Sequence, residues 1–255
     1  MSLCDVHCHT ERSACAEDVT LDWYVDIARN TDAVFTITDH SAQLFYPPDN
    51  RWAFWGDNPR EVFDSCRDEG PARIASYIED VRAVQTGGML LGIELDIFID
   101  GTVVCDEDRL GDFDLLLGVA HTFPALRAEA DVEEVYDQFQ TMVGHLAKLN
   151  IDALAHPFRP MRGKGYEISD DLIKWLVDIA GEYDFALEIN SHSICRDEDI
   201  RMAKLAWEMG VELAVGTDSH RKAEFGDFSY HREIAHVVGV RADDLYWCPT
   251  LPETV

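Results

Sequence analysis

The sequence predicts a distorted seven-stranded (β/α) barrel that forms a single α/β domain over residues 1–255. Three observations lead to this prediction: the length of 255 residues, seven short apolar runs, and segments of helical periodicity between the runs. Strands that alternate with helices pair in parallel through right-handed crossovers, as an open sheet or as a closed barrel. Seven such units favour the barrel, which often has about this length as one domain.

Each apolar run is expected to form one strand. Polar residues bound every run, as is typical of strands that are buried in a parallel sheet. In chain order the runs are residues 3–8, 33–38, 89–95, 115–120, 152–155, 185–189 and 212–216.

Helices are expected between the runs because apolar residues there recur at helical spacing. The clearest case is residues 131–149, where Val135, Phe139, Met142 and Leu146 share one face. The helices expected in chain order are residues 20–30, 71–85, 131–149, 170–181 and 197–209.

Residues 41–70 interrupt this alternation, with prolines, many charges and the aromatic residues Trp52 and Trp55, but no sustained period. We interpret the segment as a long loop over the face where the strands end. Two roles stay open at this point. The loop is a substrate lid, or it packs its own aromatic residues against the barrel or a neighbouring subunit.

The composition limits the partners. The chain has 49 acidic and 21 basic residues, a formal net charge of −28, so we expect no long nucleic acid to bind it. Without a run of 18 apolar residues or a signal-peptide pattern, no contact with a membrane is expected and the predicted location is cytoplasmic. Seven cysteines without a CxxC pair predict reduced thiols. A homo-oligomer is left open.

Metal-binding residue types gather at the ends of the predicted strands. All strand C-termini of a parallel barrel open on one face, so residues distant in sequence meet there. Imidazole and carboxylate groups are ligands for Zn, Mn or Fe. The residues at or just past the ends of the runs are His7, His9, His40, Glu94, His121, His156, Asp218 and His220. A metal site on this face is therefore predicted.

These strand ends carry the motifs DVHCHT, TDH, GIE, AHTF, AHPF and GTDSH, in this order. The set resembles the polymerase and histidinol phosphatase (PHP) domain family, over nearly the whole chain. The resemblance implies a distorted seven-stranded barrel with two or three divalent metal ions. It also matches two motif acids, Asp5 and Asp39, which we expect to orient the imidazoles.

The resemblance further implies which residues hold each metal. The first metal would be held by His7, His9, Glu94 and Asp218. Glu94 would bridge to a second metal, completed by His121 and His156. A third would lie with His40 and His220. Where phosphatase-like members of the family commonly have a histidine, this chain has Cys15. Either Cys15 is a thiolate ligand, or the third site is weak, empty or completed by Glu17 or Asp18.

The function predicted from these residues is a metal-dependent phosphoesterase that hydrolyses a small phosphorylated metabolite or a short nucleotide with a metal-activated hydroxide. Glu94, Asp218 and His192 are the catalytic candidates, and the leaving group would take its proton from Asp218, His192 or water. Histidinol phosphatase activity and amide or lactone hydrolysis are the alternatives, with a non-catalytic metal-binding module the remaining one.

Positive charge for an anionic substrate is concentrated after His156, in the sequence HPFRPMRGK. Arg159 and Arg162 are therefore the candidate phosphate ligands, because a guanidinium group matches phosphate geometry. Surface counter-charge is the alternative for both. Asn190, at the end of the sixth run, is a further candidate for substrate binding.

Overall fold

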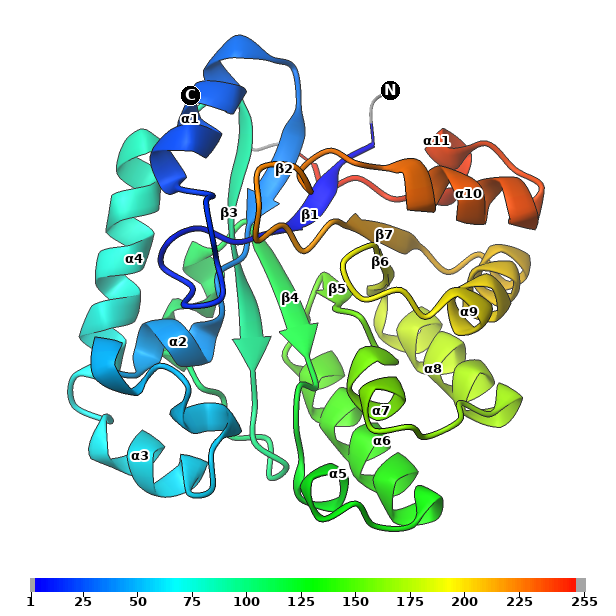
Figure 1. Ribbon diagram of the computed structural model, residues 1–255, viewed down its shortest axis with the longest axis horizontal. Coiled ribbons are helices and arrows are strands. Elements are labelled where there is room, and N and C mark those ends of the chain that lie inside the picture. The colour runs from blue at the N-terminus through cyan, green and yellow to red at the C-terminus, as the bar shows by residue number, and fades with distance from the viewer. Residues whose placement is uncertain (1–2, 251–255) are drawn as a thin grey trace.

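Seven parallel strands pair in sequence order and close into a barrel in the computed structural model, which describes residues 3–250 (Figure 1). The strands are β1 (Asp5–Cys8), β2 (Val34–Ile37), β3 (Gly88–Asp96), β4 (Leu115–Val119), β5 (Ala153–Leu154), β6 (Ala186–Asn190) and β7 (Leu213–Gly216). Their lengths are unequal, with 9 residues in β3 and 2 in β5. The predicted distorted seven-stranded barrel is confirmed.

Helices surround the barrel and connect its strands. They are α1 (Leu21–Asn30), α2 (Ser41–Phe45), α3 (Pro59–Ser65), α4 (Gly70–Val84), α5 (Pro124–Ala128), α6 (Val132–Lys148), α7 (Arg159–Gly163), α8 (Asp170–Tyr183), α9 (Arg196–Met209), α10 (Ser229–Val238) and α11 (Ala242–Leu245). Three short 3₁₀ segments are η1 (Pro48–Asn50), η2 (Ala53–Trp55) and η3 (Glu107–Asp112). All five predicted helices are present, at bounds within three residues of those expected.

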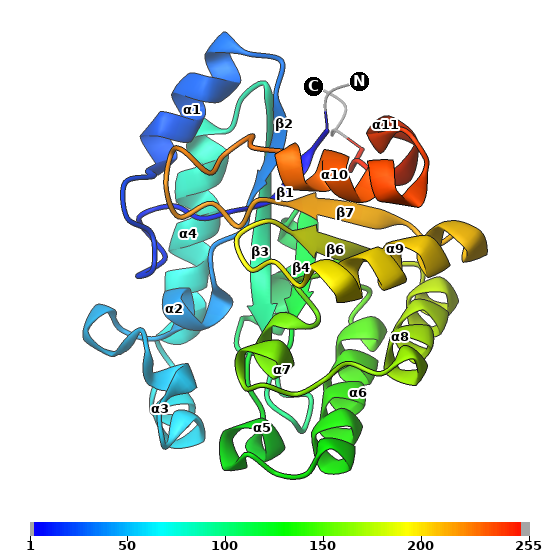
Figure 2. The ribbon, with the colours of Figure 1, turned by 45° about the vertical axis from the view of Figure 1, so that its right-hand side comes forward.

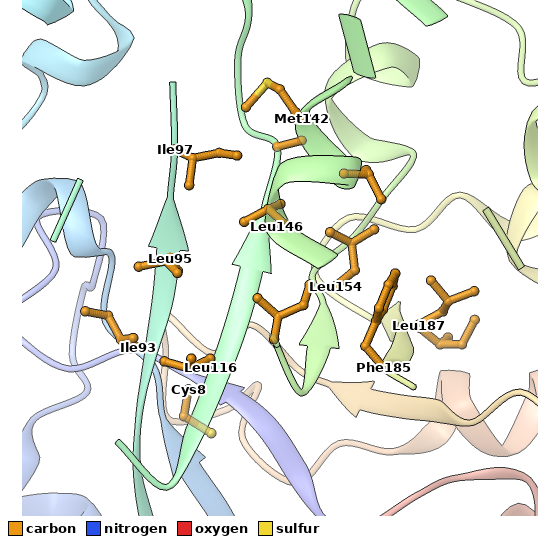
Figure 3. Packing of buried hydrophobic residues seen from close by; sticks show 14 of the residues in the cluster. Cys8, Ile93, Leu95, Ile97, Leu116, Met142, Leu146, Leu154, Phe185 and Leu187 are labelled. Carbon is orange, nitrogen blue, oxygen red and sulfur yellow. The ribbon is translucent and has the colours of Figure 1, made fainter. Parts of the chain in front are cut away.

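Alternation along the strands separates two apolar layers. Figure 3 shows Leu95 of β3 and Leu154 of β5 in the layer that packs against the helices, with Met142 and Leu146 of α6. Since neighbouring strand residues point to opposite sides, Glu94 faces the barrel interior. A separate interior cluster, which includes several alanines, fills the barrel: Val6, Leu115, Leu117, Val119, Ala153, Ala155, Ala186 and Ala214.

Residues 41–70 are not the continuous loop that we predicted. They form α2, η1, η2 and α3, and Pro48 and Pro59 each begin one of these short elements. Phe45 stacks on Phe63 at 5.1 Å between ring centroids. The turns are too short to produce a period in the sequence, but their aromatic residues pack as a small core. Figure 2 shows α2 and α3 to the left of the arrowheads of β3 and β4, with α7 and α5 below them.

The prediction that all cysteines are reduced is wrong for one pair. Cys4 and Cys248 form a disulfide with 5.4 Å between their Cα atoms. The chain after α11 returns to the barrel, where Tyr246 pairs with Leu213 of β7, and this brings Cys248 beside the residue preceding β1. A pairing across 244 residues leaves no signal in cysteine spacing. Cys8, Cys15, Cys66, Cys105 and Cys195 are free thiols.

Over residues 3–250, no helix is both long enough and apolar enough to cross a membrane.

Candidate metal centre

The eight histidine and carboxylate residues predicted from the strand ends converge on one face of the barrel. Seven of them are buried, and His121 is partly buried. Two of them lie on strands, His7 on β1 and Glu94 on β3. The others follow the ends of strands: His9 after β1, His40 after β2, His121 after β4, His156 after β5, and Asp218 and His220 after β7. The barrel therefore collects the whole set at one place.

Glu94 lies at the centre of the cluster. Its Oε1 is 3.2 Å from Nε2 of His121 and 3.2 Å from Nε2 of His156. Its Oε2 faces the other way, 3.5 Å from Nε2 of His7 and 3.8 Å from Nε2 of His9. A carboxylate whose two oxygens face two separate groups of imidazoles has the geometry of a group that bridges two cations.

Buried polar atoms without hydrogen bonds mark the same place. Nε2 of His7, Nδ1 of His40 and Oε2 of Glu94 have no hydrogen-bond partner, although His40 Nδ1 lies 2.5 Å from Glu94 Oε2. Leaving such atoms buried and unpaired is costly. A cation bound between these nitrogen and oxygen atoms would accept their lone pairs. The donor set of imidazoles and carboxylates fits a divalent metal.

Asp218 organises the other half of the cluster. Its Oδ1 is 3.0 Å from Nε2 of His9, and its backbone oxygen is 2.7 Å from Nδ1 of His220, which leaves Nε2 of His220 available. The backbone φ is 52° at Asp218 and 23° at His156. Both values lie in the left-handed region that non-glycine residues seldom occupy and that concentrates at functional sites.

Several overlapping groups of ligand atoms lie within 4.8 Å of one another. They include His7, His9 and Glu94; His7, His156 and Asp218; His9, Asp218 and His220; His40, Glu94 and His121; and His9, Cys15 and His40. The cluster is thus able to hold metal ions. His40 lies with the Glu94 and His121 group as well as with Cys15, whereas the resemblance paired it with His220.

Charges within the cluster shift the pKa values strongly. Burial alone would raise the pKa of Glu94, but the imidazoles of His40, His121 and His7 hold it well below its usual value. The pKa of Asp218 is also well below its usual value, because the interactions with His7 and His9 outweigh the effect of burial. Burial alone would lower the pKa of His121, but the carboxylates of Glu94 and Asp96 raise it to about 9. Both carboxylates are therefore ionised, as ligands for a cation must be.

Cys15 lies within reach of His9 and His40, where the sequence departs from the family pattern. Burial, with Glu94 and Asp218, raises the pKa of its thiol. The other two candidates for that position are engaged elsewhere. Glu17 pairs with Arg221, and Asp18 accepts a hydrogen bond from the backbone of Lys222. Cys15 is the candidate of the three that faces the cluster.

Sequence reasoning missed Glu188, a buried residue of β6 that positions two imidazole-bearing residues. Its Oε1 is 2.8 Å from Nδ1 of His7, and its Oε2 accepts a hydrogen bond of 2.5 Å from the backbone N–H of His156. Asp96 of β3 was also missed and contacts Nδ1 of His121 at 2.8 Å. The available signal was an acidic residue inside an apolar run for Glu188 and directly after one for Asp96, in both cases on the side that faces the barrel interior.

Asp5 and Asp39 do not contact imidazole rings directly, contrary to our expectation. Asp5 accepts hydrogen bonds from the backbone and the hydroxyl of Thr217. Asp39 accepts from the backbone and the hydroxyl of Thr10, and from Ser13 Oγ, which itself lies 3.3 Å from Nδ1 of His9. The two acids hold the turns that carry the ligands, because backbone and hydroxyl donors are closer to them than the rings.

Of the two arginines predicted to bind phosphate, only Arg159 reaches the cluster. Its Nη1 is 2.9 Å from Oδ2 of Asp218. Arg162 is exposed and pairs with Glu198 at 3.3 Å. Cavities of about 570 Å³ and 770 Å³ lie beside Arg159, which lines both, whereas Arg162 lines the smaller one and does not line the larger one. Arg159 is thus the cation at the border between the metal centre and the open cavities.

The remaining two predicted residues lie at the end of β6. Asn190 is buried, with its Oδ1 accepting from the backbone of His192 and Ser193 and its Nδ2 donating to Glu188. Its amide is therefore used to shape this turn. His192 is exposed and its ring centroid lies 4.7 Å from that of His220, at the mouth of the cluster.

Comparisons with known proteins find a family and relatives that this chain resembles. The family described as PHP domain matches residues 5–192. A probable phosphatase of Yersinia enterocolitica is 27% identical over 243 residues, which cover 91% of this chain and 85% of the relative. A probable phosphatase of Citrobacter koseri is 27% identical over 237 residues, covering 90% and 83%.

Among solved structures, a histidinol phosphate phosphatase of Lactococcus lactis, complexed with zinc, L-histidinol and phosphate, superimposes with a TM-score of 0.58. The match covers 94% of this chain and 95% of that chain at 15% identity. At this level of identity the likeness concerns the fold.

Proposed function

The chain belongs to the PHP domain family, and on this premise we propose that it is a metal-dependent phosphoesterase that acts on a small phosphorylated molecule. The observation that carries the proposal is the Glu94-centred cluster, whose unpaired buried atoms suit cations, with Arg159 at its border. Relatives named probable phosphatases support the reaction class. The cavities beside Arg159 are large enough for a small metabolite or nucleotide.

We propose that the cluster holds two or three divalent ions, Zn, Mn or Fe. The proposed ligands of the first are His7, His9, Glu94 and Asp218, and those of the second are Glu94, His121 and His156. His40, His220 and Cys15 are the proposed ligands of a third. When bound, such ions lower the pKa of water and neutralise charge on the phosphoryl oxygens.

The chain's own residues bind and orient the phosphoester. Arg159 would turn its guanidinium group from Asp218 toward a phosphoryl oxygen, where a planar pair of N–H donors fits best. His192, exposed at the mouth, would donate the proton that the leaving oxygen needs. Its Nδ1 lies 3.6 Å from Oε1 of Glu224.

Measurement of turnover tests this proposal. Metal-loaded protein is assayed on a panel of phosphomonoesters and phosphodiesters, L-histidinol phosphate among them, with amide and lactone substrates for the alternative chemistry. Replacing Arg159 with Ala should raise KM for the preferred phosphoester about tenfold, because a charge-assisted hydrogen bond is lost. Arg241→Ala, at an exposed arginine that pairs with Asp244 and lines neither cavity, is the matched control and should change KM less than twofold. No turnover of any phosphoester in several metals would disprove the proposal.

Cys15 gives a separate prediction about the metal content. If its thiolate is a ligand, Cys15→Ser should lower the number of bound ions from three to two per chain, because a serine hydroxyl stays protonated and binds zinc weakly. Elemental analysis of protein purified without chelator measures this number. Cys66→Ser, at a buried thiol remote from the cluster, should leave it unchanged. The same number of ions in Cys15→Ser as in the unchanged protein would rule out the thiolate ligand.

The predictions of a cytoplasmic location, of no long nucleic acid and of a possible homo-oligomer stay predictions. The formal charge of −28 supports the prediction that no long nucleic acid binds. A small phosphate can reach local arginines, whereas a long polyanion would be repelled by the acidic surface.

A further inference from the structure

One wall of the larger cavity is formed by residues 55–57, which lie outside the strand-end motifs. Trp55 lines this 770 Å³ cavity together with the apolar residues Pro124 and Leu126. The indole ring also lies directly beside the metal cluster, with its centroid 5.5 Å from that of His40 and 5.5 Å from that of His121. Trp55 thus contacts the histidines of the cluster and also lines the cavity.

Trp55 is held in place by Arg127 of α5. The Nη2 of Arg127 donates 2.9 Å to the backbone oxygen of Phe54, and its Nη1 donates 3.3 Å to that of Gly56. Its Nε donates to Thr122 Oγ1 at 2.9 Å. The two residues on either side of Trp55 are therefore tied to the turn that carries His121. This fixes the indole at the boundary between cluster and cavity.

The cavity is larger than a phosphate group requires, and a pocket of this size typically encloses a small organic ligand. A phosphoryl group held at the cluster and Arg159 would leave its organic substituent in the cavity, beside Trp55. The polar groups of Arg127 are already occupied by the protein, and Lys164 pairs with Glu129. Polar residues of the lining also include Asp57 and His121, but Trp55, Pro124 and Leu126 offer a flat and apolar surface, which suits aromatic stacking.

We infer that Trp55 determines specificity for the leaving group, selecting phosphomonoesters of aromatic or heteroaromatic alcohols, and that Arg127 is the positioning residue that holds it. This inference rests on the proposed function, since it assumes that the cluster binds the phosphoryl group. It also gives residues 55–57 a role in substrate recognition, which the sequence left open between a lid and simple packing.

Binding of two non-hydrolysable probes tests the inference without turnover. Phenylphosphonate carries an aromatic ring and methylphosphonate does not, and calorimetry on metal-loaded protein gives both dissociation constants. We expect phenylphosphonate to bind about tenfold more tightly, in the range of one stacking contact. Trp55→Ala should remove this preference while changing methylphosphonate binding less than twofold. Trp207→Ala, an exposed tryptophan on α9, is the control and should keep the preference.

Two further variants show whether Trp55 acts on ligand preference or only supports the local structure. Trp55→Phe keeps a ring beside His40 and His121, so it should retain all bound metal and part of the preference. Arg127→Met should lower the preference in the unchanged background. In the Trp55→Ala background it should have no further effect, because the residue acts through Trp55.

The outcomes distinguish the two proposals. If methylphosphonate binds but phenylphosphonate gains nothing, or if Trp55→Ala and Trp55→Phe both keep the full preference, the role of Trp55 is overturned and the proposed phosphoesterase stands. If neither probe binds metal-loaded protein, the proposed function fails, and the inference fails with it.

Discussion

Glu94→Gln should remove most of the bound metal and lower kcat/KM for phosphoesters by more than about 100-fold. Removing a group that only orients a metal ligand lowers metal affinity or activity about 10- to 100-fold. Glu94 is itself a proposed ligand, so we expect a larger effect. Its two oxygens face separate groups of imidazoles at 3.2 to 3.8 Å. The amide keeps the shape of the side chain but removes the charge and one acceptor oxygen, so it cannot hold two cations.

Elemental analysis and steady-state kinetics on the same preparation check this prediction. Glu182→Gln, an exposed change on α8, is the matched control and should alter neither value. Thermal unfolding in the presence of chelator shows whether the variant is folded. A Glu94→Gln protein with unchanged metal content and activity within about threefold would contradict the central role of this carboxylate.

The fold was predictable because each strand is a short apolar run with polar boundaries. What the sequence did not predict has identifiable causes. Helix α10 was not predicted, although its buried residues Tyr230, His231, Ile234 and Ala235 recur at helical spacing. The short helices of residues 41–70 span too few turns for any period to emerge. The bond between Cys4 and Cys248 depends on the return of the chain to β7.

The candidate site shows a similar division. Strand-end position was enough to predict that the eight histidine and carboxylate residues would meet, because a parallel barrel has one C-terminal face. It was not enough to rank Arg159 above Arg162, which lie one helical turn apart in α7. Only the structure shows that Arg159 contacts Asp218 while Arg162 contacts Glu198. The backbone hydrogen-bond partners of Asp5 and Asp39 could not be predicted from the sequence either, because they depend on how the turns fold.

Gly216→Ala should weaken metal binding about 10- to 100-fold, although Gly216 is not itself a proposed metal ligand. A Cβ atom at this position of β7 would lie 1.7 Å from Oε1 and 2.5 Å from Cδ of Glu188. Glu188 is fully buried, so its carboxylate would have to leave the position from which it holds His7 and the backbone of His156. Partners of this kind set the orientation of ligating imidazoles, and their loss typically has this cost.

A double-mutant cycle identifies Glu188 as the group through which the change acts. Glu188→Ala alone should weaken metal binding to a similar extent, measured by competition with a chromogenic chelator. Gly216→Ala added to Glu188→Ala should then have no further effect, because the clash has gone with the carboxylate. Gly144→Ala, in α6 with no atom near its Cβ position, is the control and should leave metal binding unchanged while slightly stabilising the helix. Additive losses in the cycle would show that Gly216 is required for a reason other than Glu188.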